Sequence, residues 1–165
     1  MNTDLAPARG IGAPVSALIL RAESLLAAIP PSLPLLALRV ALAVPFFKSG
    51  LTKWDGVLTL SSGAQYLFQD EFKLHILGSE IPYPFPLVMA TGAGLAEIIL
   101  PIFLILGLGT RFAALGLLVM TAIIQLTIPD GWANFHLPWA AMALALIVFG
   151  GGRMALDPLV LPRRR

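Results

Sequence analysis

The sequence predicts an all-α integral membrane protein: a four-helix bundle with an N-terminal amphipathic interfacial helix and a short helix in an outer loop. Of its 165 residues, 58% are apolar and 12% are charged, whereas soluble domains have about 45–50% apolar and about 25% charged residues. Residues 86–109 form an apolar run interrupted by Glu97, long enough to cross a hydrocarbon core of about 30 Å. Two further apolar runs, 112–129 and 135–152, and the mainly apolar segment 33–54 complete four spans.

The segment 1–33 is expected to be a cytoplasmic tail followed by a helix on the inner membrane surface. From Val15 onward, apolar residues recur at helical spacing, while Arg21 and Glu23 fall on other positions. This pattern is typical of a helix that lies in the membrane interface. The turn residues of "IPPSLP" end the helix and lead the chain into the membrane. A helix that binds a partner or packs against the bundle is the alternative.

The first transmembrane helix is predicted at about 34–53. Pro45 lies inside it and is expected to kink it, because the proline ring removes a backbone donor. One helical face collects Arg39, Ala43, Phe46 and Gly50.

The outer loop 55–84 is too long for a plain connection. Ser62 and Gln65 have the spacing of a capping box. The apolar residues that follow share a helical face: Ala64, Leu67, Phe68 and Phe72. A short helix over the outer mouth of the bundle is therefore predicted.

The remaining transmembrane helices are predicted at about 85–108, 111–128 and 134–150. Glycines in "GLGTR" and at the end of the last apolar run stop two of these helices. The four-helix domain then covers 34–160, and a basic cytoplasmic tail, 161–165, follows it.

The distribution of charge predicts a multi-pass protein of the bacterial cytoplasmic (inner) membrane with both termini in the cytoplasm. This orientation places most basic residues inside, as the positive-inside rule requires: Arg9, Arg21, Arg111, Arg153, Arg163, Arg164 and Arg165. It also places the tryptophans and tyrosines on the outer side, as an interfacial belt: Trp54, Tyr66, Tyr83, Trp132 and Trp139. A net charge of +2 without a basic face argues against nucleic-acid binding.

Glu97 is the polar residue that most needs an explanation, because an unpaired carboxylate deep in a membrane costs about 3 kcal/mol or more. Arg39 is the expected partner and Lys48 the second choice. One interpretation is a structural Arg39–Glu97 pair that sets the helix register. The other is a polar pocket, opening outward, that the pair forms with Lys48, Gln125 and His136.

Further candidates for the outer mouth are Lys53, Trp54, His136 and Trp139. The sequence has no cysteine, which excludes disulfides and thiol catalysis by this chain. His75 and His136 are isolated histidines, so no metal site is predicted. Because no catalytic constellation is visible either, we do not expect a self-contained enzyme, and catalytic residues are not assigned.

Three motifs together resemble the DoxX family of small four-helix membrane proteins. "LRVALAVPFFKSGLTKW" at 38–54 is similar to the opening signature of that family, with Arg39, Gly50 and Lys53 at the matching positions. "AGLAEIILPIFLILGLGTR" resembles its glutamate helix and glycine-rich turn, matched by Glu97, Gly107, Gly109 and Arg111. "WANFHLPWAAMALALIVFGGGRMALD" is similar to the ending found in one branch. The resemblance covers about 34–160.

The resemblance implies a role beside redox or stress systems. The family is named for a subunit of a thiosulfate:quinone oxidoreductase, and the branch in question accompanies bufferin-type metal-stress peptide clusters. The amphipathic N-terminal helix, the basic tail and the missing catalytic constellation favour a non-catalytic accessory protein that docks soluble or membrane partners. The alternatives are a quinone-interacting oxidoreductase subunit and a transporter of small solutes or protons. Quinone is the cofactor to consider, the lipid bilayer is one partner, and a homo-oligomer remains open.

Overall fold

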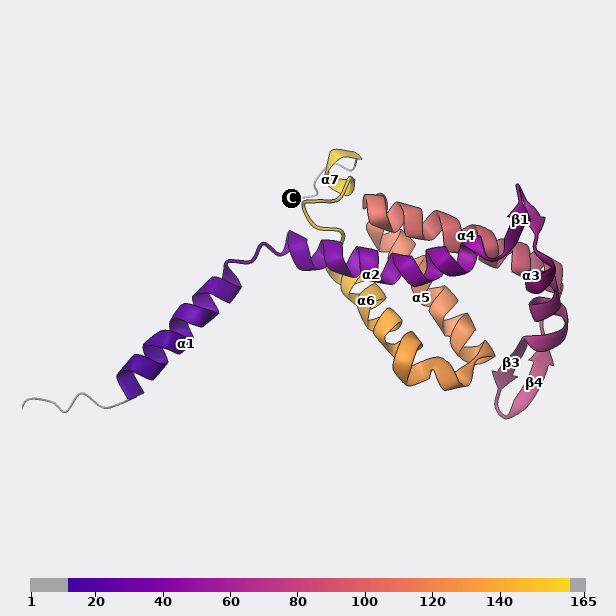
Figure 1. The fold of residues 1–165 in the computed structure, drawn as a ribbon, viewed down its shortest axis with the longest axis horizontal. Helices are drawn as coiled ribbons and strands as arrows, with labels where there is room; N and C mark the ends of the chain where they lie inside the picture. Colours follow the sequence, from indigo (N-terminus) through magenta and orange to yellow (C-terminus); the bar gives the residue numbers. More distant parts are fainter. Residues whose placement is uncertain (1–11, 161–165) are drawn as a thin grey trace, which may run out of the picture. The chain divides into compact units, whose positions relative to one another are not determined.

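The computed structural model describes residues 12–160, drawn in colour in Figure 1. The chain divides into two units, one up to Pro31 and one from Ser32 onward. The first unit contains helix α1 (Gly12–Ala27), whose large apolar side chains, among them Leu18, Ile19 and Leu25, are exposed. The helix is present as expected, and its location at the membrane surface stays a prediction.

The second unit is a bundle of long apolar helices, as the sequence predicts. Within the described residues, four helical stretches are long and apolar enough to cross a membrane: α2 (Ser32–Leu51), α4 (Pro86–Leu106), α5 (Thr110–Thr127) and Pro129–Phe149. The last stretch joins a 3-10 turn η2 (Pro129–Gly131), a π-turn η3 (Trp132–His136) and α6 (Leu137–Phe149). Most residues of each stretch face outward, as those of helices surrounded by lipid do.

Small and branched side chains make up the core of the bundle. Helix α2 packs mainly on α4, α5 packs mainly on α6, and both pairs touch each other. Alanines allow the helices to approach closely, and larger side chains fill the space between them: Leu42, Phe46, Leu104, Leu117 and Leu146. The face of α2 that carries Arg39, Ala43, Phe46 and Gly50 is buried.

Glycines end the helices at one end of the bundle. Gly107 caps α4 at φ 70° and Gly109 precedes α5 at φ 58°, a left-handed conformation that glycine adopts without steric cost. Gly150, also at positive φ, follows α6. The chain then forms a short helix, α7 (Asp157–Val160). We call this end, with the 107–109 turn and residues 150–157, the arginine end.

The opposite end, which we call the loop end, carries residues 52–85. The expected short helix is present as α3 (Ser62–Tyr66), continued by a π-turn η1 (Leu67–Glu71), and its Ala64 and Phe68 are buried. Its cap differs from the prediction: the hydroxyl of Ser61, not Ser62, accepts the bond from the Ala64 N–H. Ser61 has the extended backbone that a cap requires, whereas Ser62 is already helical.

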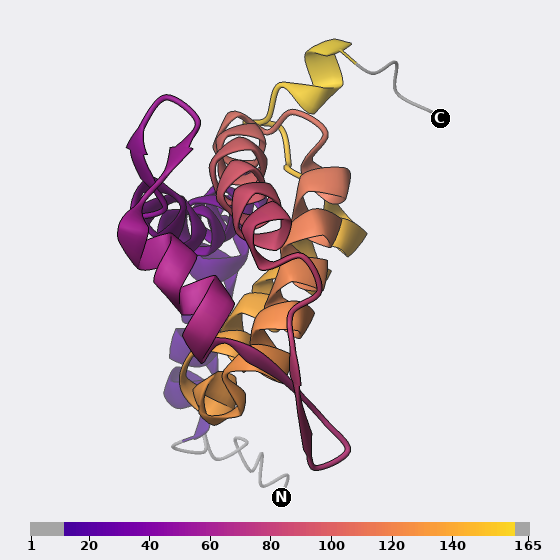
Figure 2. The ribbon, with the colours of Figure 1, turned by 90° about the vertical axis from the view of Figure 1, so that its right-hand side faces the viewer.

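Two β-hairpins, which the sequence analysis does not predict, flank this helix. One pairs β1 (Trp54–Gly56) with β2 (Thr59–Leu60), and the other pairs β3 (Lys73–Ile76) with β4 (Ser79–Pro82), both antiparallel. Figure 2, seen from the loop end, shows them projecting to opposite sides. The strands are too short for an alternating apolar pattern to identify them.

Candidate functional site

A cavity of about 950 Å³ lies at the loop end, between the helices and beneath the loop. Its volume falls within the range of about 300–1,000 Å³ that is typical of small-molecule sites. Most lining side chains are apolar, among them Phe46, Phe68, Phe72, Met89, Met120, Ile124 and Trp139. The polar lining includes Ser49, Lys53, Glu97 and His136. The cavity is therefore an apolar chamber with a few polar groups in its wall.

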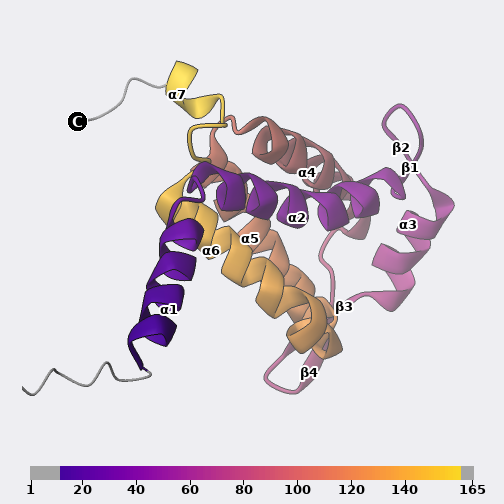
Figure 3. The ribbon, with the colours of Figure 1, turned by 60° about the vertical axis from the view of Figure 1, so that its left-hand side comes forward.

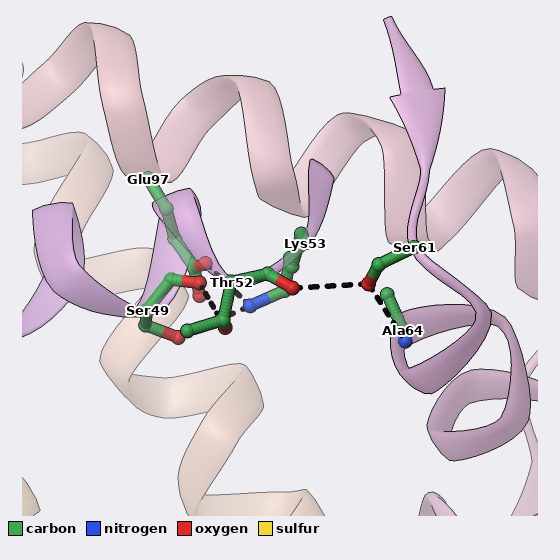
Figure 4. A network of polar contacts seen from close by, with 6 residues as sticks. All are labelled: Ser49, Thr52, Lys53, Ser61, Ala64 and Glu97. Atoms are coloured by element: carbon green, nitrogen blue, oxygen red, sulfur yellow. Dashed lines mark hydrogen bonds and ion pairs between the residues drawn. The ribbon is translucent and has the colours of Figure 1, made fainter. Parts of the chain in front are cut away.

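The strongest polar feature of the wall is an ion pair between α4 and the residues that follow α2 (Figure 4). Lys53 Nζ lies 2.5 Å from Glu97 Oε2, and the two side chains are 12% and 5% exposed. Lys53 Nζ also donates to Ser49 Oγ at 3.1 Å. A short, buried and charge-assisted bond of this kind holds both side chains in place.

The loop holds the backbone around Lys53. The Ser61 hydroxyl donates to the Thr52 carbonyl at 3.0 Å, and the Ser61 N–H donates to the Lys53 carbonyl at 2.9 Å. The same hydroxyl caps α3, so the covering helix and the lysine share one hydrogen-bonded network (Figure 4). The loop thus positions the cationic group of the cavity.

Glu97 meets Lys53 because α2 and α4 approach each other closely at Gly50. A Cβ at Gly50 would lie 3.0 Å from the Glu97 backbone and Cβ, so glycine is needed at this crossing. Lys53 follows Gly50 by less than one helical turn. The crossing therefore places the lysine beside the acid.

The expected Arg39–Glu97 pair is wrong. Arg39 lies at the arginine end, where Nε donates to the Leu104 carbonyl at 2.8 Å and Nη2 to that of Ile105. Its Nη1 donates to the carbonyls of Gly151 and Met154, at 3.1 and 3.3 Å. In α2, Arg39 is about 16 Å from Gly50 at 1.5 Å per residue, too far to meet Glu97 at the crossing.

The last carbonyls of α4 explain where Arg39 goes instead. They have no partner within the helix and carry the negative end of its dipole, so they attract a guanidinium. Asp157 satisfies the neighbouring helix start, accepting from the N–H groups of Gly109 and Thr110 at 2.6 and 3.0 Å. Arg39 and Asp157 thus close the arginine end of the bundle.

Two other predicted cluster members also lie outside the cavity. Lys48 is exposed on α2. Gln125 does not line the cavity but contacts His136, which does. The Gln125 Nε2 donates to the Pro129 carbonyl at 3.1 Å, and its Oε1 lies 2.6 Å from His136 Nδ1. Because that oxygen is an acceptor, Nδ1 carries the proton, and Nε2 is the remaining polar atom of the ring.

Of the candidates predicted for the outer mouth, three line the cavity and Trp54 does not. Lys53, His136 and Trp139 line the cavity, and the Trp139 ring packs 5.0 Å from Phe46 and 5.5 Å from His136 between centroids. Trp54 instead packs against α4, where a Cβ at Gly94 would lie 2.8 Å from its ring. Its Nε1 is buried and has no hydrogen-bond partner among the described residues.

Sequence reasoning missed Ser49 and the Tyr83–Thr127 contact. Ser49 is one turn before Lys53, and this spacing could have identified it. The Tyr83 hydroxyl lies 2.5 Å from Thr127 Oγ1, so it ties the loop to the end of α5 at the cavity wall. The sequence carries no signal for this contact, because the two residues are far apart in the chain.

Comparison with known proteins agrees with the architecture. The sequence model of the DoxX family matches residues 34–130, which is more than half of the chain. An uncharacterized protein of Haemophilus influenzae is 33% identical over 139 residues, which span 76% of this chain and 82% of that relative. No solved structure matches significantly.

Proposed function

Since the chain belongs to the DoxX family and is a multi-pass membrane protein, we propose that it binds a quinone-class molecule in the loop-end cavity as a non-catalytic accessory subunit of a redox pathway. The observation that carries the proposal is the Lys53–Glu97 pair in the wall of an otherwise apolar chamber. A quinone ring is flat and apolar and carries carbonyl acceptors at its rim. The chamber offers a matching combination of surfaces.

The donor set supports a carbonyl ligand. A lysine ammonium has three N–H donors, of which Glu97 and Ser49 engage two. The third is available to a carbonyl oxygen in the cavity. Because the site is buried, such a bond gains strength from the low local dielectric.

The aromatic lining supports a flat ring. Phe46 and Trp139 pack at a tilt of 53°, and Phe68, Phe72 and Tyr83 form a second group beneath the loop. Aromatic pairs favour offset or edge-on contacts, which accommodate another planar ring. Both groups line the same cavity.

The accessory role, the partners and the location belong to the same proposal. The family resemblance supports a link to a quinone-dependent or metal-stress system in the bacterial inner membrane. The exposed apolar residues of α1 support contact with a lipid surface or with a protein partner. Both termini are proposed to be cytoplasmic.

Binding of a tail-less quinone to the protein in lipid nanodiscs tests the proposal. Trp139 lines the cavity, so we expect duroquinone to quench tryptophan fluorescence saturably, beyond the quenching seen with free tryptophan. Lys53→Met combined with Glu97→Gln removes the donor without leaving a buried charge, and should weaken binding at least tenfold. The matched control is Lys48→Met on the exposed side of α2, which should bind normally. Absence of saturable binding to the wild type would overturn the proposal.

A cavity-filling variant checks the location independently of charge. Ala96 lines the cavity, and Ala96→Phe should abolish binding while the protein keeps its helical circular dichroism. If Ala96→Phe binds as the wild type does, the ligand lies elsewhere.

A further inference from the structure

Helices α4 and α5 meet at the arginine end and separate toward the loop end. They are joined there by the 107–109 turn, and a Cβ at Gly116 in α5 would lie 2.8 Å from Leu100 in α4. From this close contact the two helices diverge, as Figures 1 and 3 both show. The cavity lies in the wider part, since residues from the loop-end halves of both helices line it.

Some residues in the wall of the cavity keep a large exposed fraction. Val88 in α4 is 69% exposed and Ile123 in α5 is 37% exposed, yet both line the cavity. Gly92, about one helical turn after Val88 in α4, is exposed, and a Cβ there would meet nothing within 4 Å. Gly92 therefore leaves open space in the wall, because this position has no side chain.

A groove outside the bundle continues from this part of the wall. It has a volume of about 410 Å³ and is lined by Leu87, Val88, Thr91, Gly92 and Leu95. Val88 and Gly92 belong to the groove and to the cavity, so the two spaces adjoin. The groove lies on the outward side of a membrane-spanning helix, which faces lipid.

The chemistry of the groove selects an apolar occupant. Its lining is aliphatic apart from Thr91, and the Thr91 hydroxyl already donates to the Leu87 carbonyl at 2.8 Å. A hydrocarbon or isoprenoid chain gains contact there without losing hydrogen bonds to water. A polar ligand finds no free donor on this surface.

We propose that the ligand of the cavity carries a long apolar chain, which leaves the cavity beside Gly92, between α4 and α5, and lies in the groove along α4. The inference rests on the proposed function and narrows the ligand to a lipid-soluble, chain-bearing quinone that enters from the membrane. The polar pair then holds the ring, and Gly92 provides the opening for the chain.

The test compares two quinones with and without a chain, duroquinone and decylubiquinone, in the same nanodiscs. Gly92→Leu fills the opening and should weaken the binding of decylubiquinone at least tenfold. The affinity for duroquinone should stay within about twofold of the wild-type value. The matched control is Gly63→Leu in α3, where a Cβ also meets nothing within 4 Å and which does not line the cavity. This control should bind both quinones as the wild type does.

The outcomes separate the two proposals. If Gly92→Leu loses binding of both quinones, or binds both as the wild type does, the proposed route of the chain is overturned. The cavity then stays the proposed site of the ring. Failure of both quinones to bind the wild type overturns the proposed function and this inference with it.

A second measurement uses the wild-type protein and does not depend on the folding of a variant. A decylquinone with a diazirine at the end of its chain should label the α4 segment 87–95 in preference to the exposed α6 residues Leu144 and Val148. Excess unlabelled decylubiquinone should remove this labelling. Equal labelling of both helices, unaffected by the competitor, would mean simple partition into lipid and would overturn the inference.

Discussion

At the scale of single residues, the two buried charges of the membrane helices serve different purposes. Arg39 donates to four backbone carbonyls from two segments, which only a planar guanidinium can do with its several fixed donors. Glu97 faces one lysine and the cavity. The first arrangement joins backbone segments, and the second leaves a polar group accessible to a ligand.

Arg39→Lys should lower the free energy of unfolding by about 3 kcal/mol or more. Hydrogen bonds from charged donors are worth about 1.5–3 kcal/mol each, and a lysine ammonium cannot reproduce the planar set of guanidinium N–H donors. Reversible unfolding in mixed micelles measures the change. Arg153→Lys, at an exposed position of the same end, should shift stability by less than about 0.5 kcal/mol. Equal effects of the two variants would contradict the role given to Arg39.

Lys53→Met should destabilise the protein by about 3–5 kcal/mol, since it leaves Glu97 buried without its cationic partner. Adding Glu97→Gln should recover a large part of this loss. The same unfolding assay, applied to both single variants and the double variant, gives the coupling energy. A coupling energy near zero would mean that the two side chains do not interact.

At the scale of elements, the loop is organised by hydrogen bonds that a pattern of apolar residues does not reveal. The tip of the second hairpin has Leu77 at φ 50° and Gly78 at φ 82°, the left-handed pair of a two-residue type I′ turn. Asparagine is the usual residue at the first of these positions, so the sequence "ILGS" does not predict a hairpin turn. Even so, the apolar face of α3 and η1 could be predicted, because it follows helical spacing.

Ser61→Ala should cost about 1–2 kcal/mol, toward the upper part of the range for a helix cap, because the hydroxyl also binds the Thr52 carbonyl. Hydrogen exchange of the Ala64 amide should accelerate in this variant. Ser62→Ala is the control one residue away and should leave that amide protected. The reverse result would restore the cap predicted from the sequence.

At the scale of the whole molecule, the bundle combines tight and loose regions. The arginine end is closed by side chain to backbone bonds, whereas the loop end contains the cavity and its covering loop. The backbone-joining contacts of Arg39 and Asp157 and the proposed binding site thus lie at opposite ends of the same helices. Changes at the arginine end are expected to alter folding without altering the shape of the cavity.

The orientation in the membrane can be measured directly, because the sequence contains no cysteine. Leu77→Cys at the loop end should react with a membrane-impermeant maleimide added to intact spheroplasts. Arg153→Cys at the arginine end should react only after the membrane is disrupted. The opposite pattern would reverse the predicted topology, and reaction of both in intact spheroplasts would contradict an odd number of spans between them.

The sequence by itself determined that four apolar helices cross a membrane, which glycines end them, and which residues share one face of α2. These features depend on local composition and on the helical period, and both can be read along the chain. Only the tertiary structure decided that Glu97 pairs with Lys53, that Arg39 binds the end of α4, and that α4 and α5 separate around a cavity. The physical reason is that helix register depends on where two backbones approach closely, here at Gly50 and Glu97. A polar side chain then takes the partner that this register brings within reach.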